Sequence, residues 1–229
     1  MKELKGLKNW QVKTDLILGK SRLEKDINLA VRKYPKLKHI KEKKFGHCLY
    51  GTIDITGVNG EVYDSFKVKL VFIGKYPFQL PFLFDIGNRI PHSEERHISK
   101  SGICCVCSKR EQDVRQQKGI RVLEFLNEYV IPFYANQLYF EQEKEWVNGD
   151  YKHFDEGVLQ DYQELTGIED SNAIVNCITD ARKCRAGRNE SCPCGSELKY
   201  KNCHRVLYDE IKKLSNDRVL EDIETLNSL

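Results

Sequence analysis

Long apolar runs are missing from this 229-residue sequence, and so is any strong excess of charge of one sign. No window reaches the roughly 20 apolar residues that a membrane-spanning helix needs, and the basic N-terminus lacks the apolar stretch of a secretory signal. We therefore expect a soluble, cytoplasmic protein with no membrane contact. A formal net charge of +3 gives no reason to expect a nucleic-acid partner. Internal repeats and low-complexity tracts are also missing.

Nine cysteines could suggest disulfides, but their odd number is not that of a complete disulfide framework. Cys192 and Cys194 are separated by one residue, and Cys203 follows after eight more, directly before His204. Three thiolates and one imidazole fill the tetrahedral shell of zinc and leave no position for water or substrate. Gly195 permits the positive φ of a tight loop around a metal. We therefore expect a structural zinc ion, so that any chemistry must lie elsewhere.

The segment that carries these residues, from Gly187 to His204, closely resembles the SEC-C motif. This small zinc module ends the bacterial secretion ATPase and is appended to many unrelated bacterial proteins. The resemblance implies that Cys192, Cys194, Cys203 and His204 are the zinc ligands and that the module docks other proteins. It implies nothing about the activity of the rest of the chain.

The pattern of the N-terminal two thirds predicts an α+β domain. Apolar residues at helical spacing predict a helix that is capped by Ser21 and ends at Pro35. Alternating segments then predict an antiparallel meander, whose hairpin turn lies at residues 58–60. The predicted strands cover residues 46–55, 62–73 and 82–86. One helix followed by such a meander is typical of an α+β fold.

The polar, cysteine-bearing stretch at residues 91–119 is long for a loop in a compact domain, and such loops are usually functional. A helix with a bend at Pro132 is predicted to follow it. Further helices are predicted at residues 156–165 and 207–226. Residues 167–188 are mixed in character and indicate a linker or a shoulder of the zinc module.

Two motifs at this loop resemble the ubiquitin-conjugating (UBC) family. The turn Tyr76-Pro77-Phe78-Gln79-Leu80-Pro81 precedes a predicted strand, and the run Gly102-Ile103-Cys104-Cys105-Val106 follows later. In that family a Tyr-Pro-Phe-x-Pro-Pro turn precedes a strand and a loop that ends in Gly-x-(Ile/Leu)-Cys-Leu. The resemblance extends over roughly residues 15–170. The C-terminal part of bacterial members is similar to the series Trp146, Gly149, His153, Gly157 and Tyr162.

The resemblance implies that a cysteine of this loop carries an acyl group as a thioester. Counting from Gly102 favours Cys105, and Cys104 is the alternative. Neighbouring residues of an extended segment face opposite sides, so only one of the two can face a groove. The family's His-Pro-Asn, whose Asn supports the oxyanion, has no Asn counterpart here. Backbone N–H groups and His97 are the candidate donors in its place.

Other interpretations of the cysteines stay open. His97, Cys104, Cys105 and Cys107 could form a second zinc site, although they lack two separated ligand pairs. The loop cysteine could instead be a protease nucleophile paired with His153, although no protease signature surrounds it. Nearby cations are expected to lower the pKa of the loop thiol. These cations are Lys100, Lys109 and Arg110. Cys177 and Cys184 are expected to pack in a core or to add metal ligands.

Together these patterns predict a UBC-like catalytic domain and a zinc-bearing tail. The predicted parts are a catalytic domain at residues 1–172, a linker at 173–187, the SEC-C module at 188–206 and a C-terminal helix at 207–229. This architecture resembles the conjugating component of bacterial antiphage (CBASS-type) operons. That implies transfer of the C-terminus of a cGAS/DncV-like nucleotidyltransferase through a cysteine thioester to a lysine of an acceptor protein. The competing hypothesis is an inactive UBC-like adaptor.

Overall fold

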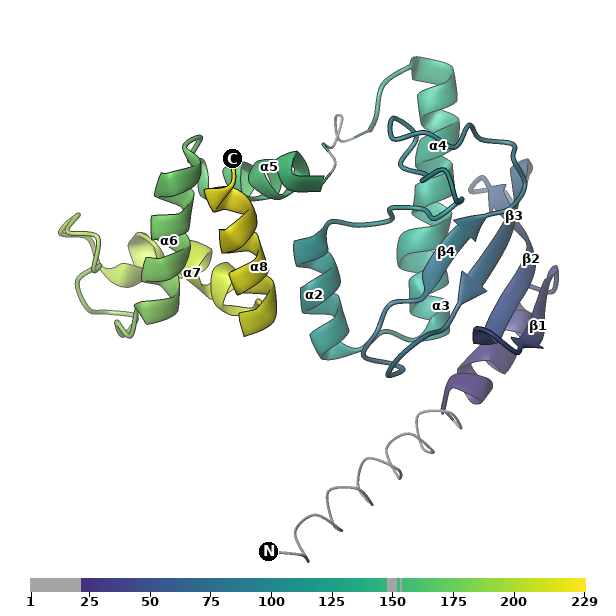
Figure 1. Cartoon of the computed structure of the whole chain (residues 1–229), viewed down its shortest axis with the longest axis horizontal. Helices are drawn as coiled ribbons and strands as arrows, with labels where there is room; N and C mark the ends of the chain where they lie inside the picture. Colours follow the sequence, from purple (N-terminus) through teal and green to yellow (C-terminus); the bar gives the residue numbers. More distant parts are fainter. Residues whose placement is uncertain (1–21, 148–151, 153) are drawn as a thin grey trace, which may run out of the picture. The chain divides into compact units, whose positions relative to one another are not determined.

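The computed structural model describes residues 22–147, 152 and 154–229, and the chain forms two compact units (Figure 1). Unit 1 comprises Met1–Cys107 and Lys118–Asp150. Unit 2 comprises Ser108–Gln117 and Tyr151–Leu229. The chain therefore enters unit 2 twice. No helix in the described part of the chain combines the length and the apolar character needed to cross a membrane.

A four-stranded antiparallel sheet forms the centre of unit 1, and its strands follow one another in chain order. They are β1 (Leu37–Glu42), β2 (Gly46–Thr56), β3 (Val62–Val71) and β4 (Phe82–Asp85). The predicted α+β class and the antiparallel meander are confirmed. The sequence pattern did not predict β1. Leu37 is the only buried residue of this strand and Ile40 is exposed, so there is little alternation of polar and apolar positions to detect.

One helical run after the cysteine loop packs against the sheet. It consists of α3 (Val122–Phe125), the π-helical segment η1 (Leu126–Val130) and α4 (Ile131–Glu143). A π turn directly precedes Pro132, where a bend was predicted, and in it the Ile131 N–H donates to the carbonyl of Leu126. Proline has no N–H for the regular ladder, and a wider turn directly before it accommodates that loss.

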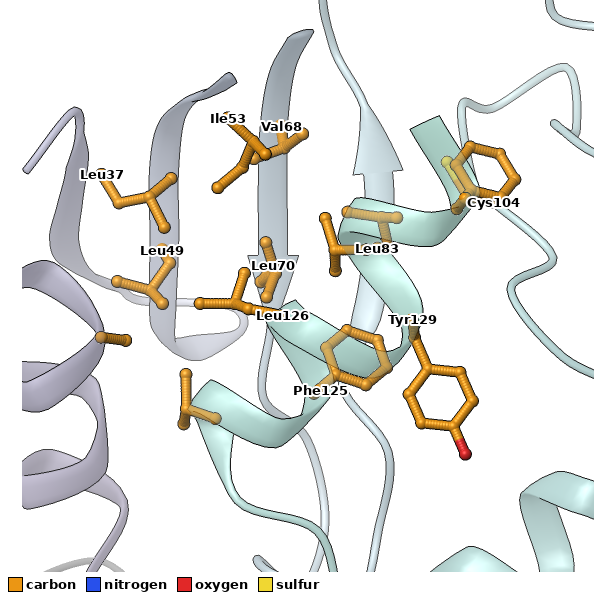
Figure 2. Close-up of a cluster of buried hydrophobic side chains, with 14 of the residues drawn as sticks. Leu37, Leu49, Ile53, Val68, Leu70, Leu83, Cys104, Phe125, Leu126 and Tyr129 are labelled. Carbon is orange, nitrogen blue, oxygen red and sulfur yellow. The ribbon is translucent and has the colours of Figure 1, made fainter. Parts of the chain in front are cut away.

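The core of unit 1 lies between one face of the sheet and the helices. Figure 2 shows apolar side chains of the strands meeting Phe125, Leu126 and Tyr129 of the helical run. The N-terminal helix, residues 22–33 of the described chain, adds buried residues such as Ile27. This helix was predicted to start at Ser21, which lies outside the described residues.

A buried carboxylate, Asp26, ties this helix to the rest of unit 1. Tyr76 donates its hydroxyl to Asp26, and Arg121 donates from Nε at 3.1 Å. The Tyr76 oxygen also accepts the N–H of Val122 at 3.2 Å. Burial alone would raise the pKa of Asp26, but the hydrogen bonds from Arg121 and Tyr76 outweigh it and lower the pKa.

We expect Asp26→Asn to destabilise unit 1 by about 2 kcal/mol at pH 7, because a hydrogen bond to a charged acceptor contributes roughly 1.5–3 kcal/mol. The pKa is lower in the folded than in the unfolded state. The carboxylate therefore stabilises the fold above its unfolded pKa of about 3.9, and this contribution is lost as the pH falls through the folded pKa. Urea unfolding of wild type and of Asp26→Asn, from pH 7 to about pH 3, measures how the difference in their free energy of unfolding depends on pH. A difference that stays constant as the pH falls below about 4 would contradict the assignment.

Unit 2 is helical in its described part and has a separate apolar core. Its elements are α2 (Lys109–Lys118), α5 (Phe154–Thr166), α6 (Ser171–Lys183), the 3-10 turn η2 (Tyr200–Asn202), α7 (Arg205–Lys212) and α8 (Asn216–Asn227). The helix predicted at residues 156–165 is confirmed. The predicted domain boundary at residue 172 differs from the division of the structure, because Val158 and Tyr162 of α5 are buried in the core of unit 2.

Two further expectations about the tail are corrected. Residues 173–187 are not a linker, since most of them belong to α6, which Asp170 caps by accepting the N–H of Ala173. Ile174 and Ile178 of that helix are fully buried, so the mixed sequence is an amphipathic helix. Residues 207–229 are not one helix either. The chain turns before Ser215, whose side chain caps α8 by accepting the N–H of Arg218.

Candidate functional sites

The predicted metal ligands Cys192, Cys194, Cys203 and His204 lie together in unit 2, and their ligand atoms are all within 4.8 Å of one another. His204 Nδ1 is 3.4 Å from the Sγ of Cys192 and 3.1 Å from that of Cys203. The Sγ atoms of Cys194 and Cys203 are 3.6 Å apart. These separations are those of neighbouring ligands around one tetrahedral zinc ion, whose bonds to sulfur and nitrogen are about 2.0–2.3 Å long.

Local backbone structure explains why a short segment brings these four side chains together. The Cys192 N–H donates to the carbonyl of Leu198 at 2.8 Å, which closes a small antiparallel loop. Gly195 turns the loop with a φ of +79°, a conformation that favours glycine. Cys203 ends η2, and His204 is the N-cap residue of α7, so the metal cluster lies at the start of that helix.

The chemistry of the donor set also fits zinc. Hydrogen bonds from Ser196 lower the pKa of the Cys194 thiol to about 6, which favours the thiolate that binds a metal. Cys192 is buried within the apolar core of unit 2, whereas Cys194 is exposed. Three cysteines and one histidine leave no position for a substrate. When bound, zinc would stabilise the fold of this segment and would do no chemistry.

The remaining cysteines do not form a second metal cluster in the described part of the chain. Cys177 and Cys184 lie in the core of unit 2 and are outside the ligand cluster, as packing predicts. His97, Cys104, Cys105 and Cys107 are not gathered as ligands, since Cys104 belongs to the core of unit 1. The alternative of a second zinc site is therefore wrong for these residues.

The cysteine-bearing run continues the edge of the sheet beyond β4. The Cys104 N–H donates to the carbonyl of Leu83 at 2.9 Å, and the Asp85 N–H donates to that of Gly102 at 2.8 Å. Gly102 has a φ of +84° and ends a turn in which its N–H donates to the carbonyl of Ser99. The added segment is thus held to β4 in a fixed register.

This register places the two adjacent cysteines on opposite sides, as expected for extended chain. Cys104 is buried among the core residues in Figure 2, while Cys105 is exposed. Burial raises the pKa of the Cys104 thiol to about 12, so Cys104 stays protonated and inaccessible. Cys105 is the accessible thiol of the pair.

His97 lies beside Cys105, but its contact is through the backbone. The carbonyl of His97 accepts the N–H of Cys105 at 2.8 Å. Its imidazole packs against the indole of Trp146, with ring centroids 5.1 Å apart. The ring of Phe140 in turn stacks on Trp146, with centroids 4.5 Å apart. Trp146 from the predicted series therefore supports the cysteine loop, whereas Gly149 and His153 lie outside the described residues.

One electrostatic expectation about the loop is corrected. Cys105 is exposed as a residue, but surrounding protein atoms partly desolvate its thiol and raise the pKa, and no neighbouring cation lowers it. Of the three cations expected to lower it, Arg110 instead pairs with Asp161 of unit 2 at 3.0 Å. Proximity in the sequence therefore does not give this thiol an activating charge.

A polar cluster that sequence reasoning missed supports the same segment from the core side. The buried Asp85 carboxylate contacts His92 Nε2 at 3.0 Å and accepts the hydroxyl of Tyr134 at 3.3 Å. Its backbone is paired with Gly102, against which the His92 ring also packs. The only sequence signal was a lone acid at the end of an apolar strand, which says nothing about its partners.

Comparison with known proteins confirms the predicted SEC-C motif. The SEC-C motif matches residues 188–205. The protein translocase subunit SecA of Coxiella burnetii (strain RSA 493 / Nine Mile phase I) is 43% identical over 57 residues, which is 25% of this chain and 6% of that protein. The chain thus spans only a small part of this relative. No solved structure matches the chain.

Proposed function

We propose that this protein is a UBC-like acyltransferase that carries the C-terminus of a protein partner on Cys105 and passes it to a lysine amine. The single observation behind the proposal is the exposed Cys105 in a segment that the edge of the sheet fixes, beside a buried neighbour. The order of elements agrees with the UBC resemblance: a helix, an antiparallel meander, a cysteine loop and further helices.

The chemistry needs one accessible thiol and no strong internal base. The Cys105 thiolate attacks the activated carbonyl carbon of the partner's C-terminus, a C–S bond forms and the activating group leaves. A lysine amine then attacks the thioester carbon, a C–N bond forms, the amine loses a proton to solvent and the Cys105 thiolate departs. Because burial raises the pKa of Cys105, we expect loading to accelerate as the pH rises above 7.

The oxyanion formed in both steps requires hydrogen-bond donors. The N–H of Cys105 is already donated to the His97 carbonyl, so it is not the donor. We keep the His97 imidazole as the candidate donor, with a second role for His97 in fixing the loop through its backbone.

The partners belong to the same proposal. On the resemblance to CBASS-type conjugating components, the acyl donor is a cGAS/DncV-like nucleotidyltransferase and the setting is bacterial antiphage defence. The SEC-C module, with its structural zinc, would dock a protein partner. Its closed ligand set supports a structural role for the metal and no catalytic one.

Intact mass under non-reducing conditions tests the proposal. The protein is co-expressed with its genomic neighbours as wild type, Cys105→Ala and Cys104→Ala. We expect a thiol-sensitive adduct of a partner's mass that is abolished in Cys105→Ala and retained in Cys104→Ala. An adduct lost only in Cys104→Ala would move the nucleophile to that residue. Adduct in none of the variants would contradict the proposal.

The alternative function is a UBC-like adaptor without catalysis. The raised pKa of Cys105 and the absence of an Asn in the His-Pro-Asn position favour it. An adaptor would bind the same partners in Cys105→Ala and in wild type, and it would form no adduct in either.

A further inference from the structure

A buried arginine lies in the stretch of unit 1 that precedes Cys105. Arg96 is only 7% exposed, and Gln137 of α4 is 1% exposed. Arg96 Nε donates to Gln137 Oε1 at 2.7 Å, and Gln137 Nε2 donates back to the Arg96 carbonyl at 2.9 Å. Glu141 Oε1, 3.4 Å from Arg96 Nη2, balances the charge, and the guanidinium lies over the ring of Phe140. This Arg96–Gln137 clamp is rigid, since displacement would leave buried polar groups unsatisfied.

The residue after the clamp, His97, has a left-handed backbone conformation with a φ of +52°. A residue with a side chain adopts this conformation at a cost in free energy and keeps it only where the surrounding structure holds it. The clamp fixes the preceding peptide, because the Arg96 carbonyl is one of the bonded groups. On the other side, Ile98 is 1% exposed and belongs to the core of unit 1. The backbone of His97 is therefore held from both sides.

The conformation of His97 decides where Cys105 lies. Ile98 forms an antiparallel bridge with Cys104, and the His97 carbonyl accepts the N–H of Cys105 at 2.8 Å. The pairing with β4 reaches Cys104, whose N–H donates to the carbonyl of Leu83. The next N–H, that of Cys105, points to the opposite side and depends on His97 for its acceptor. A change of φ at His97 would move that acceptor away.

We propose that Arg96 is a positioning residue for Cys105. The Arg96–Gln137 clamp holds His97 in the left-handed conformation, and this conformation presents the His97 carbonyl to the N–H of Cys105. Without the clamp, His97 relaxes to a negative φ and the Cys105 backbone loses its acceptor. The consequence for acyl transfer rests on the proposed function, whereas the positioning itself does not.

The test compares wild type, Arg96→Met and the control Arg89→Met on the full chain. Methionine keeps an apolar stem over Phe140 and removes the hydrogen bonds of the guanidinium. Arg89 also bonds Glu141, at 2.8 Å, but its side chain is 38% exposed. In Arg96→Met we expect hydrogen exchange of the Cys105 amide about tenfold faster and alkylation of its thiol at least about threefold faster. In Arg89→Met neither rate should change more than about twofold, since exposed ion pairs contribute little.

A double-mutant cycle with His97→Gly separates positioning from general support of the fold. Glycine adopts a positive φ without the cost that a side chain brings, so it does not need the clamp. We therefore expect Arg96→Met to accelerate exchange of the Cys105 amide less than about threefold in the His97→Gly background, against about tenfold in wild type. If Arg96 only supported the fold, the added flexibility of glycine would leave its effect as large or increase it.

Arg96→Lys keeps the charge beside Glu141 and replaces Arg96→Met if that variant does not fold. Equal acceleration in the two backgrounds would overturn the inference, as would unchanged exchange in the Arg96 variant or the same acceleration in Arg89→Met. The adduct experiment separates this inference from the proposed function. If the cycle shows coupling but wild type forms no adduct, only the proposed function fails; an adduct without coupling refutes this inference alone.

Discussion

Cys203→Ser is expected to unfold most of unit 2 while unit 1 stays folded. Cys203 is at once a cluster residue and the end of η2, so its loss removes the metal and the turn into α7. Structural zinc contributes about 10–16 kcal/mol of apparent binding free energy in zinc-finger peptides. Unit 2 also has an apolar core, so we expect a loss on the order of 5 kcal/mol in the stability of unit 2. Unit 1 should keep its own unfolding transition in urea, because its apolar core is separate from that of unit 2.

Zinc content, circular dichroism and urea unfolding measure this effect. The matched control is Cys184→Ala, which removes a buried thiol of the same core outside the metal cluster. We expect it to keep a full equivalent of zinc and to lose only about 1–2 kcal/mol, the effect of a small cavity. Zinc retained at one equivalent in Cys203→Ser, with unit 2 still folded, would show that this residue is not a structural ligand.

Gly102→Ala is expected to detach the cysteine segment from β4. A Cβ at this position would lie 2.7 Å from the backbone oxygen of Asp85 and 3.2 Å from His92 Cε1. The backbone is also in the left-handed region, at a φ of +84°. Backbone strain and the clash with Asp85 should together lower the free energy of unfolding of unit 1 by about 3 kcal/mol. Because Cys104 is held in the core through this pairing, its thiol should become open to alkylation.

Gly60→Ala separates strain from crowding. Gly60 has nearly the same φ, +86°, but nothing lies within 4 Å of the position its Cβ would take. We expect this control to cost only about 1 kcal/mol and to leave Cys104 unreactive. If Gly102→Ala and Gly60→Ala were equally destabilised, the close approach of Gly102 to Asp85 would contribute nothing to the effect. The pairing of the cysteine segment with β4 would then lose its support.

The sequence by itself was sufficient to predict the cluster of metal-ligand residues and the α+β architecture of unit 1. All four metal-cluster residues lie within 13 positions, so the spacing of the chain and one glycine turn almost dictate their geometry. The meander was equally predictable, because antiparallel neighbours are joined by short turns and alternate in polarity. Only β1, with a single buried residue, had too weak a pattern.

Tertiary structure decided everything that depends on residues far apart in the chain. Whether Asp85 meets His92 and Tyr134, or Asp26 meets Arg121, follows from packing that no local pattern encodes. The clearest case is α2, a mostly polar helix without a buried residue that follows the cysteine loop. Its sequence favours neither unit. Long-range contacts assign it to the unit that holds the metal cluster, among them the pairing of Asp113 with Ser215, 102 positions away. Local propensity acts over a few residues, whereas such assignments come from contacts that form only when the whole chain folds.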